Sequence, residues 1–358
     1  MTSYLLAGGG TAGHVNPLLA LADLIRAEEP EARIAVLGTR EGLEARLVPE
    51  RGYELVTIER LPFPRRPNLD ALRFPRRFAR AVRAVRALIR ERGIDVVVGF
   101  GGYASAPAYR AGAAEGVPVV IHEANAKPGM ANRLGARATR FVGVTFPGTP
   151  IPHARVTGMP LRPEITGLDR AGLRAEARAH FGLDPARRTL LVTGGSLGAR
   201  AINRGIAGAA AELTAAGIQV LHIWGGLTEL EDPGVADYRV LEYCDRMDLA
   251  LAACDLAVSR AGSTTVSELA GLGVPAVLVP YSHGNGEQRF NAASVVAAGG
   301  ALLVEDAELT PAWVRETLIP LALDGARLAR MSERARGVGT LDGTERLLAL
   351  VRDALAAR

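Results

Sequence analysis

His14 is the residue of this sequence best placed to do chemistry. It follows three glycines at 8–10 and Gly13, between a short apolar run and a helical pattern that we expect to begin at Pro17. Glycines at a strand tip let backbone N–H groups approach a ligand, and the helix behind them points the positive end of its dipole at an anion. A neutral imidazole there can accept a proton near pH 7. The stretch predicts an anion site with a general base; the alternative is an ordinary hydrogen-bonded surface histidine.

Several common site types are not indicated by the sequence. The glycines do not fit G-x-G-x-x-G cleanly and lack the Lys-Ser/Thr of a P-loop, which disfavours a nucleotide kinase or ATPase. No D-x-D, H-E-x-x-H or clustered Cys/His set occurs, so we expect no tightly held metal. Cys244 and Cys254 have neither metal-ligand nor redox spacing and predict buried thiols in a reducing cytoplasm. We expect neither a transmembrane helix nor a signal peptide.

A second candidate site lies in residues 259–268, where a strand end meets a helix start rich in hydroxyl residues. Thr264 and Thr265 suit phosphate oxygens at a helix N-terminus. Glu268, about one turn further on, can accept hydrogen bonds from two vicinal ribose hydroxyls. The alternative is a capping box, in which Glu268 caps a helix that begins at one of the two threonines. The residues alone leave this choice open.

A third polar stretch, residues 280–291, follows a strand that we expect at 276–279. Glu287, Gln288 and Asn291 lie there at helical spacing and could hold the hydroxyls of a sugar. By itself the stretch is equally an ordinary polar loop.

Short β-rich runs alternate with helical patterns along the whole chain. Strands are expected at residues 4–6, 34–37, 55–58, 96–98, 117–121, 141–144, 189–192, 220–223, 256–258, 276–279 and 301–303. Helices are expected at 17–28, 40–48, 70–92, 104–114, 129–136 and 342–356. This alternation predicts an α/β fold of two doubly wound parallel sheets, with ligands beyond the carboxyl ends of the strands. Five prolines in residues 147–163 indicate a linker, which predicts domains at 1–160 and 161–340 and a C-terminal helix, 341–358, that packs back on the first domain.

Residues 60–92 form a basic segment. They contain eleven arginines against two acidic residues, whereas the chain as a whole carries a net charge of only +4. From Phe78 to Ile89 an apolar stripe predicts a helix face that packs on the sheet. Before it, a proline-broken mixture of apolar residues and arginines suits an anionic membrane surface; the alternatives are a solvated face or RNA binding. The expected membrane patch consists of Leu61, Phe63, Arg65, Arg66, Leu72, Arg73, Phe74, Arg76 and Arg77.

Taken in order, the motifs at residues 8–17, 101–103, 122–125, 194–199 and 260–268 resemble those of the MurG family of UDP-N-acetylglucosamine transferases. The resemblance spans nearly the whole chain. It implies the GT-B architecture, two Rossmann-like domains facing a cleft. It also implies inverting transfer of GlcNAc from UDP-GlcNAc to lipid I, which gives lipid II in peptidoglycan synthesis. Two departures are Leu197 and Glu287, where the family commonly has glutamine.

The resemblance also implies residue roles. UDP-GlcNAc would be bound by Thr11, Ala12, Gly13, Asn125, Arg162, Ser196, Cys244, Thr264, Thr265, Glu268, Gln288 and Asn291. The acceptor diphosphate would be bound by Gly9, Gly10, His14, Gly102 and Tyr103. Within the first set, Ser196 and the two threonines would contact the diphosphate and Glu268 the ribose, which favours function over the capping box. His14 is our candidate for the general base, with orientation of the acceptor diphosphate as its rival role and Glu123 as the alternative base.

The implied partners are UDP-GlcNAc, the lipid I acceptor, the anionic inner leaflet of the cell membrane and other cell-wall synthesis proteins, with no nucleic acid. We expect a cytoplasmic protein that is peripheral on the membrane and has no tightly bound cofactor, which is compatible with stimulation by a divalent cation. Three alternatives remain: a UDP-GlcNAc epimerase, a glycosyltransferase for another lipid acceptor, and a non-catalytic nucleotide-sugar-binding protein.

Overall fold

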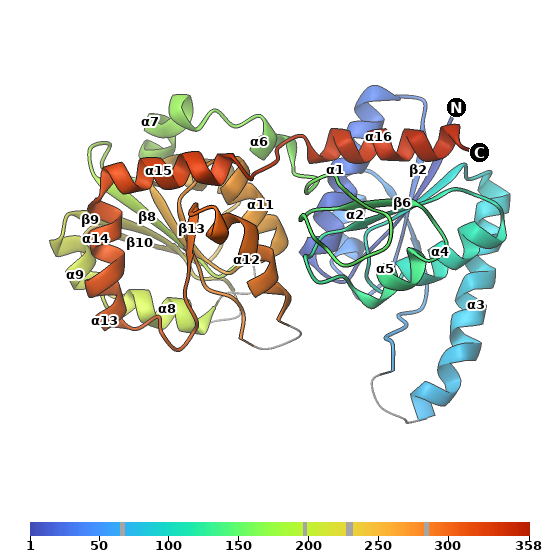
Figure 1. Ribbon diagram of the computed structural model, residues 1–358, viewed down its shortest axis with the longest axis horizontal. Coiled ribbons are helices and arrows are strands. Elements are labelled where there is room, and N and C mark those ends of the chain that lie inside the picture. Colours follow the sequence, from blue (N-terminus) through green and yellow to red (C-terminus); the bar gives the residue numbers. More distant parts are fainter. Residues whose placement is uncertain (65–68, 196–198, 227–231, 283–285) are drawn as a thin grey trace. The chain divides into compact units, whose positions relative to one another are not determined.

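The computed structural model describes residues 1–64, 69–195, 199–226, 232–282 and 286–358. Contacts divide the chain into two units, one formed by Met1–Arg162 with Asp342–Arg358 and the other by Pro163–Leu341. Each unit is built on one sheet whose strands pair in parallel, with helices packed around it (Figure 1). The predicted class of two doubly wound parallel-sheet domains is therefore confirmed.

The N-terminal sheet has seven strands in the order β3-β2-β1-β4-β5-β6-β7. Their bounds are β1 (Ser3–Ala7), β2 (Arg33–Gly38), β3 (Glu54–Thr57), β4 (Val96–Gly99), β5 (Val119–Glu123), β6 (Phe141–Val144) and β7 (Ala154–Val156). The order reverses beside β1, where Ala7 pairs with Leu37 on one side and Gly99 on the other. In an open parallel sheet such a reversal leaves a crevice at the carboxyl ends of the strands, where ligands bind.

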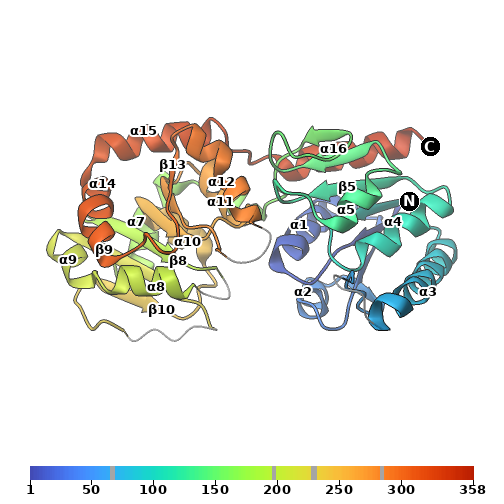
Figure 2. The same cartoon turned by 60° about the horizontal axis from the view of Figure 1, so that its bottom comes forward.

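The helices of this unit form two layers. One layer contains α1 (Ala12–Glu28), α2 (Glu44–Glu50) and α16 (Gly343–Ala356); the other contains α3 (Leu69–Arg92), α4 (Ser105–Ala114) and α5 (Met130–Gly135). The last helix, α16, lies beside α1 (Figures 1 and 2). Its Leu347 and Val351 share an apolar cluster with Leu21 and Ile25. The end of the chain therefore completes the core of the first unit.

The C-terminal sheet has six strands in the order β10-β9-β8-β11-β12-β13. Their bounds are β8 (Arg188–Thr193), β9 (Ile218–Ile223), β10 (Tyr238–Leu241), β11 (Leu256–Ser259), β12 (Ala276–Leu278) and β13 (Ala301–Leu303). Thr193 pairs with Ser259 across β8 and β11, where this order also reverses.

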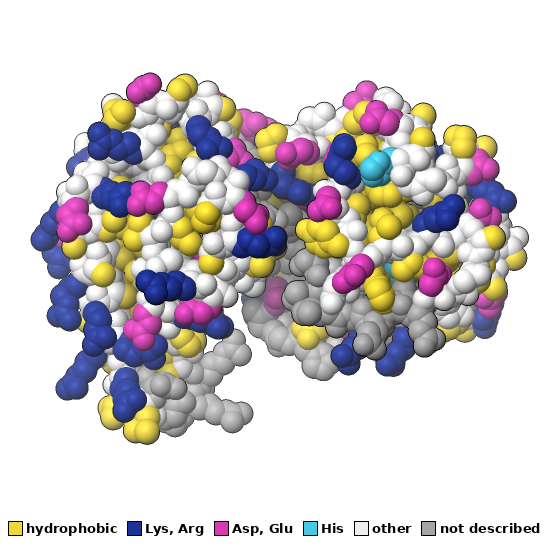
Figure 3. Space-filling model, turned by 180° about the vertical axis from the view of Figure 1, so that it is seen from behind, with side chains coloured by type: hydrophobic (Ala, Val, Ile, Leu, Met, Phe, Trp, Pro, Cys, Tyr) yellow, Lys and Arg dark blue, Asp and Glu magenta, His cyan; other side chains and the backbone are white. Residues whose placement is uncertain are grey.

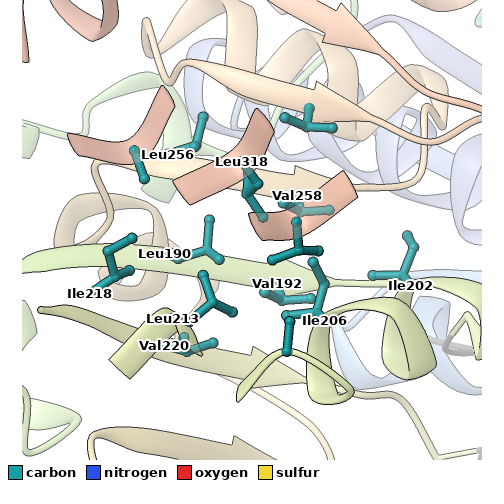
Figure 4. Packing of buried hydrophobic residues seen from close by; sticks show 14 of the residues in the cluster. Leu190, Val192, Ile202, Ile206, Leu213, Ile218, Val220, Leu256, Val258 and Leu318 are labelled. Carbon is teal, nitrogen blue, oxygen red and sulfur yellow. The ribbon is translucent and has the colours of Figure 1, made fainter. Parts of the chain in front are cut away.

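Eleven short helical segments complete the described part of the C-terminal unit. They are α6 (Pro163–Thr166), α7 (Arg170–His180), α8 (Arg200–Ala207), α9 (Ala210–Ala215), α10 (Met247–Ala253), α11 (Ser263–Gly271), α12 (Glu287–Ala297), α13 (Pro311–Trp313), the π-helical η1 (Val314–Leu318), α14 (Ile319–Leu323) and α15 (Gly325–Arg336). Leucine, isoleucine and valine side chains from β8, β9, β11 and α8 interdigitate in the core (Figure 4).

One helix, α1, differs from the sequence prediction in a way that concerns the site. The helix expected from Pro17 begins at Ala12, so Gly13 and His14 belong to its first turn. Glycine and proline are the weakest helix formers, and both occur in the first turn and a half of α1. The residue pattern therefore placed the predicted start of the helix too late in the chain. As a result His14 is held by a helix rather than by a loop.

Two strands, β7 and β10, were not predicted. β7 lies within the turn-rich passage at 147–163, and all three of its residues are exposed. Both strands form an edge of their sheet. An edge strand buries less surface than a central one, so it carries a weaker apolar pattern.

The prediction for the inner face of α3 is confirmed. Val85 and Ile89 are buried in one cluster with Leu5 and Leu37 of the sheet, and Val82 packs against that cluster. The apolar stripe therefore anchors the helix, while its arginines face away from the core.

Among the described residues, each unit buries one neutral histidine. His222 contacts the Tyr238 hydroxyl through Nδ1 at 2.7 Å and the Asn203 side-chain oxygen through Nε2 at 3.1 Å. His122 lies 3.0 Å from the Gly158 carbonyl through Nε2. Burial lowers the pKa of both imidazoles to about 4, because the charged form loses its hydration.

These pKa values predict how stability depends on pH. An unfolded histidine binds a proton below about pH 6.5, whereas the buried ones do not until about pH 4. The free energy of unfolding should therefore fall as pH is lowered from 6.5 to 4, by up to about 3 kcal/mol for each histidine. Denaturant unfolding at several pH values measures this dependence. The free energy of unfolding should fall less steeply with decreasing pH in His222→Gln than in the wild type. The exposed His180→Gln is the matched control, and equal slopes for the two variants would contradict the prediction.

Candidate active site

Two glycine loops meet at the carboxyl edge of the N-terminal sheet. One follows β1 and the other follows β4, and these strands are neighbours. Gly102 has a positive φ of 81°, and a Cβ on it would lie 2.5 Å from the Gly9 carbonyl oxygen. The Ser105 hydroxyl lies 2.9 Å from the Ala7 carbonyl and 2.7 Å from the Gly101 carbonyl. The loops predicted to take the acceptor diphosphate thus lie against each other, with Tyr103 on the second one.

His14 lies between these loops, half-buried in the first turn of α1. Its Nδ1 is 3.1 Å from the Gly9 carbonyl oxygen and 3.4 Å from the Thr11 hydroxyl. A carbonyl oxygen can only accept, so the first contact needs the proton on Nδ1. The lone pair then lies on Nε2, which would be 3.1 Å from a Cβ on Gly101. The ring therefore presents its acceptor nitrogen to the second loop, as a general base requires.

Glu44 also belongs to this site, although the sequence pattern around it does not predict a functional residue. Its carboxylate lies beneath the first loop and accepts a hydrogen bond from the Gly10 amide at 2.7 Å. It also accepts hydrogen bonds from the amide and hydroxyl of Thr39, at 2.9 and 2.8 Å. The available signal was an acidic residue shortly after the end of β2, but nothing local connects it to the glycines.

Glu123, the alternative base, ends β5 and is only 2% exposed. Its Oε1 accepts a hydrogen bond from the Asn125 amide at 2.9 Å. Its Oε2 accepts from the Gly129 amide and the Asn132 side chain, both at 2.9 Å. These contacts shape the loop that carries Asn125, and they favour His14 over Glu123 as the group facing a substrate.

In the C-terminal unit the predicted phosphate site lies at the start of α11. The helix begins at Ser263 with Gly262 as its N-cap, so Thr264 and Thr265 lie in the first turn. The Thr264 hydroxyl is buried and has no hydrogen-bond partner among the described residues. Amides of a helix N-terminus together with such a hydroxyl suit the oxygens of a phosphate.

The capping-box alternative for Glu268 is wrong. With Gly262 as the N-cap, Glu268 is the sixth residue of α11, beyond the third position from which a capping carboxylate reaches back. Its side chain is half-buried. The ribose-binding hypothesis remains for this residue.

Three further predicted residues contact the backbone of the C-terminal unit or are buried in it. Gln288, in the first turn of α12, accepts a hydrogen bond from the Tyr281 amide at 2.9 Å. Asn291 is fully buried and donates to the Ala261 carbonyl at 3.3 Å. Burial raises the pKa of the Cys244 thiol, so the thiol is protonated at neutral pH. Gln288 thus holds the backbone after β12, and Asn291 holds the backbone before α11. Contacts of all three residues with UDP-GlcNAc stay predictions.

The remaining predicted residues are distributed between the units. Ala12 and Gly13 lie in the first turn of α1, beside His14. Arg162 ends the first stretch of the N-terminal unit and is half-buried, as is Asn125. Ser196 and Leu197 lie outside the described residues. The structure therefore brings together the acceptor set within one unit and the threonines with Glu268 within the other.

The expected membrane patch is partly exposed. Leu72 on α3 is 78% exposed and its neighbour Leu69 is 70% exposed. The rings of Phe63 and Phe74 lie 5.4 Å apart. In Figure 3 arginine side chains run down the α3 edge of the N-terminal unit to an apolar group at its end.

One residue of the predicted patch is buried. Leu61 is only 2% exposed, because it packs into the unit instead of facing outward, so its inclusion is wrong. Arg77 forms an ion pair with Glu59, whereas Arg73 and Arg76 are exposed. Arg65 and Arg66 lie outside the described residues.

The described part of the chain holds neither a membrane-spanning helix nor a metal-binding cluster. None of its helices combines the length and the apolar composition needed to cross a membrane. No group of three or more histidine, cysteine, aspartate or glutamate side chains is arranged there to hold a metal ion. The expectation of no tightly bound cofactor stays a prediction.

Both halves of the chain match known domains. Residues 4–143 match the glycosyltransferase family 28 N-terminal domain, and residues 189–347 match its C-terminal domain. A Leifsonia xyli protein named UDP-N-acetylglucosamine–N-acetylmuramyl-(pentapeptide) pyrophosphoryl-undecaprenol N-acetylglucosamine transferase is 65% identical over 357 residues, which cover 100% of both chains. A Streptomyces coelicolor protein of the same name is 50% identical, covering 99% of this chain and 98% of its own.

A solved structure supports the same assignment. The crystal structure of Acinetobacter baumannii MurG aligns with a TM-score of 0.80 and 26% sequence identity, covering 99% of this chain and 100% of that one. The chain therefore belongs to glycosyltransferase family 28 and, within it, to the MurG family of UDP-N-acetylglucosamine transferases.

Proposed function

We propose that this protein transfers GlcNAc from UDP-GlcNAc to lipid I, the N-acetylmuramyl-(pentapeptide) pyrophosphoryl-undecaprenol, and so forms lipid II. The observation that carries the proposal is the 65% identity, over the whole chain, to a protein named for this reaction. The paired glycine loops around His14 and the threonine-rich start of α11 support it, since each suits one of the two diphosphates involved.

The donor is held by the C-terminal unit. The first-turn amides of α11 and the hydroxyls of Thr264 and Thr265 bind the diphosphate, and Glu268 accepts hydrogen bonds from the ribose hydroxyls. Ser196 and Arg162 add contacts to the diphosphate, as the family resemblance implies. These groups stabilise the negative charge that grows on the leaving UDP, without a tightly bound metal.

The reaction is a single displacement. The acceptor hydroxyl attacks the anomeric carbon of the donor sugar from the face opposite UDP, through an oxocarbenium-like transition state, so the configuration inverts. His14 accepts the hydroxyl proton on Nε2, while its Nδ1–H keeps donating a hydrogen bond to the Gly9 carbonyl. The amides of the first turn of α1 bind the acceptor diphosphate.

The α3 region contacts the membrane that carries the acceptor. Leu69 and Leu72 insert at the surface, and the arginines beside them face anionic headgroups on the cytoplasmic side. Each basic residue near such a surface contributes about 1 kcal/mol. Association with other cell-wall synthesis proteins is a further expectation.

A direct assay tests the function. The purified protein should move labelled GlcNAc from UDP-GlcNAc to a lipid I analogue, and it should release UDP only when the acceptor is present. An epimer formed from UDP-GlcNAc alone would indicate an epimerase. Transfer to a diacylglycerol acceptor but not to the analogue would indicate another lipid glycosyltransferase, and binding of UDP-GlcNAc without turnover a non-catalytic protein.

The role of His14 predicts a specific kinetic defect. His14→Ala should lower kcat by roughly 10²–10⁴-fold, since the variant loses a positioned base. The affinity for UDP, measured by calorimetry, should not change. A raised KM for the acceptor with unchanged kcat would instead assign His14 to binding the acceptor diphosphate.

The membrane contact predicts a matched pair of variants. Leu69→Asp/Leu72→Asp should bind vesicles of phosphatidylcholine and phosphatidylglycerol roughly tenfold less than the wild type, because two apolar side chains no longer insert. Co-sedimentation measures the loss. Leu323→Asp changes a leucine that is 48% exposed in the other unit and should bind as the wild type does. Equal binding of all three proteins would refute this contact surface.

A further inference from the structure

A buried carboxylate lies directly under the loop that carries the proposed base. Glu44 is the first residue of α2 and is completely buried. Its Oε1 accepts from the amide and hydroxyl of Thr39, and its Oε2 accepts from the Gly10 amide at 2.7 Å. A buried carboxylate is costly unless hydrogen bonds compensate it, and here both oxygens are engaged.

The surrounding glycines leave room for this carboxylate. A Cβ on Gly9 would lie 2.2 Å from Oε1 of Glu44, and one on Gly42 would lie 2.0 Å from Oε2. Neither glycine can therefore be replaced without moving the carboxylate or the backbone. The shape of the loop and the position of Glu44 depend on each other.

The peptide group between Gly9 and Gly10 links Glu44 to His14. Its N–H donates to Glu44 at 2.7 Å, while its C=O accepts from His14 Nδ1 at 3.1 Å. Hydrogen bonds in such a chain polarise one another, so a carboxylate at one end strengthens the carbonyl as an acceptor at the other. In hydrolytic triads a carboxylate holds a histidine tautomer by direct contact; here a peptide group stands between the two.

We propose that Glu44 is a positioning residue for GlcNAc transfer, acting through the Gly9–Gly10 peptide to hold His14 with the proton on Nδ1 and the lone pair on Nε2. The inference rests on the proposed function. Glu44 does not touch substrate; it decides whether the imidazole presents an acceptor to the incoming hydroxyl.

Three variants separate this role from a merely structural one. Glu44→Gln keeps the size of the side chain but removes the charge. Its NH₂ group can only donate, so its single oxygen cannot accept from both the Gly10 and Thr39 amides. Thr39→Val is the matched control, because it removes a hydrogen bond to the same carboxylate and leaves the Gly10 contact. Glu115→Gln removes a carboxylate that pairs with Arg86 and Arg90 elsewhere in the unit.

Glu44→Gln should lower kcat for transfer to a lipid I analogue by roughly 10–100-fold, by analogy with the loss when the partner that orients a metal-bound histidine is removed. The KM for UDP-GlcNAc should stay as in the wild type, and Thr39→Val and Glu115→Gln should stay within about threefold of wild-type kcat. In the His14→Ala background, Glu44→Gln should cause no further loss, since its effect passes through the imidazole.

The tautomer of His14 is a direct readout that needs no activity. In ¹⁵N NMR of the full-length wild type, with the signal assigned by its absence from His14→Ala, the neutral ring should carry its proton on Nδ1. Glu44→Gln should populate both tautomers. A proton on Nε2 in the wild type would overturn the proposal even if no Glu44 variant folds.

Two kinetic outcomes would also overturn it. One is an equal loss of kcat in Glu44→Gln and Thr39→Val when the two variants have equal Tm. The other is a loss in the His14→Ala/Glu44→Gln double variant that equals the sum of the two single losses in activation free energy. These results differ from failure of the proposed function, because in that case the wild type itself transfers no GlcNAc to the analogue.

Discussion

The parallel pairing of β1 with β4 sets the constraint on which the N-terminal site depends. The helix after β1 packs on one face of the sheet and the helix after β4 packs on the other. The two connections therefore part at the carboxyl edge, and neither helix covers the gap between them. Only glycine loops fit where these connections pass each other, as the close approach of Gly102 to Gly9 illustrates.

Two buried carboxylates give loops at this edge of the sheet a defined shape: Glu44 holds the loop after β1, and Glu123 holds the loop after β5. Glu44 and Glu123 each accept three hydrogen bonds, mostly from backbone amides of segments without regular secondary structure. Placing anions beneath a proposed diphosphate site is electrostatically unfavourable at first sight. The two carboxylates accept hydrogen bonds from amides that point inward, while the first-turn amides of α1 remain at the edge of the sheet. Loop shape and anion binding thus use different sets of amides.

The helix α3 combines a buried apolar face with exposed apolar residues at its start. Its inner stripe, with Val85 and Ile89, is part of the core cluster, whereas Leu69 and Leu72 near its start are among the most exposed apolar residues of the described chain. Arginines on the remaining faces give this helix most of the local positive charge. The core contact fixes the direction of the helix, and so the apolar residues at its start are held away from the sheet.

The sequence by itself determined the fold class, most central strands, the two glycine loops, the threonine-rich start of α11 and the family. These features are local: glycine spacing, apolar runs and strand–helix alternation are properties of neighbouring residues. Only the tertiary structure decided that α1 begins before His14, that Glu268 is not a helix cap, that Leu61 is buried and that Glu44 holds Gly10. The last contact joins residues 34 positions apart, and no local pattern records which carboxylate a folded chain brings beneath which amide.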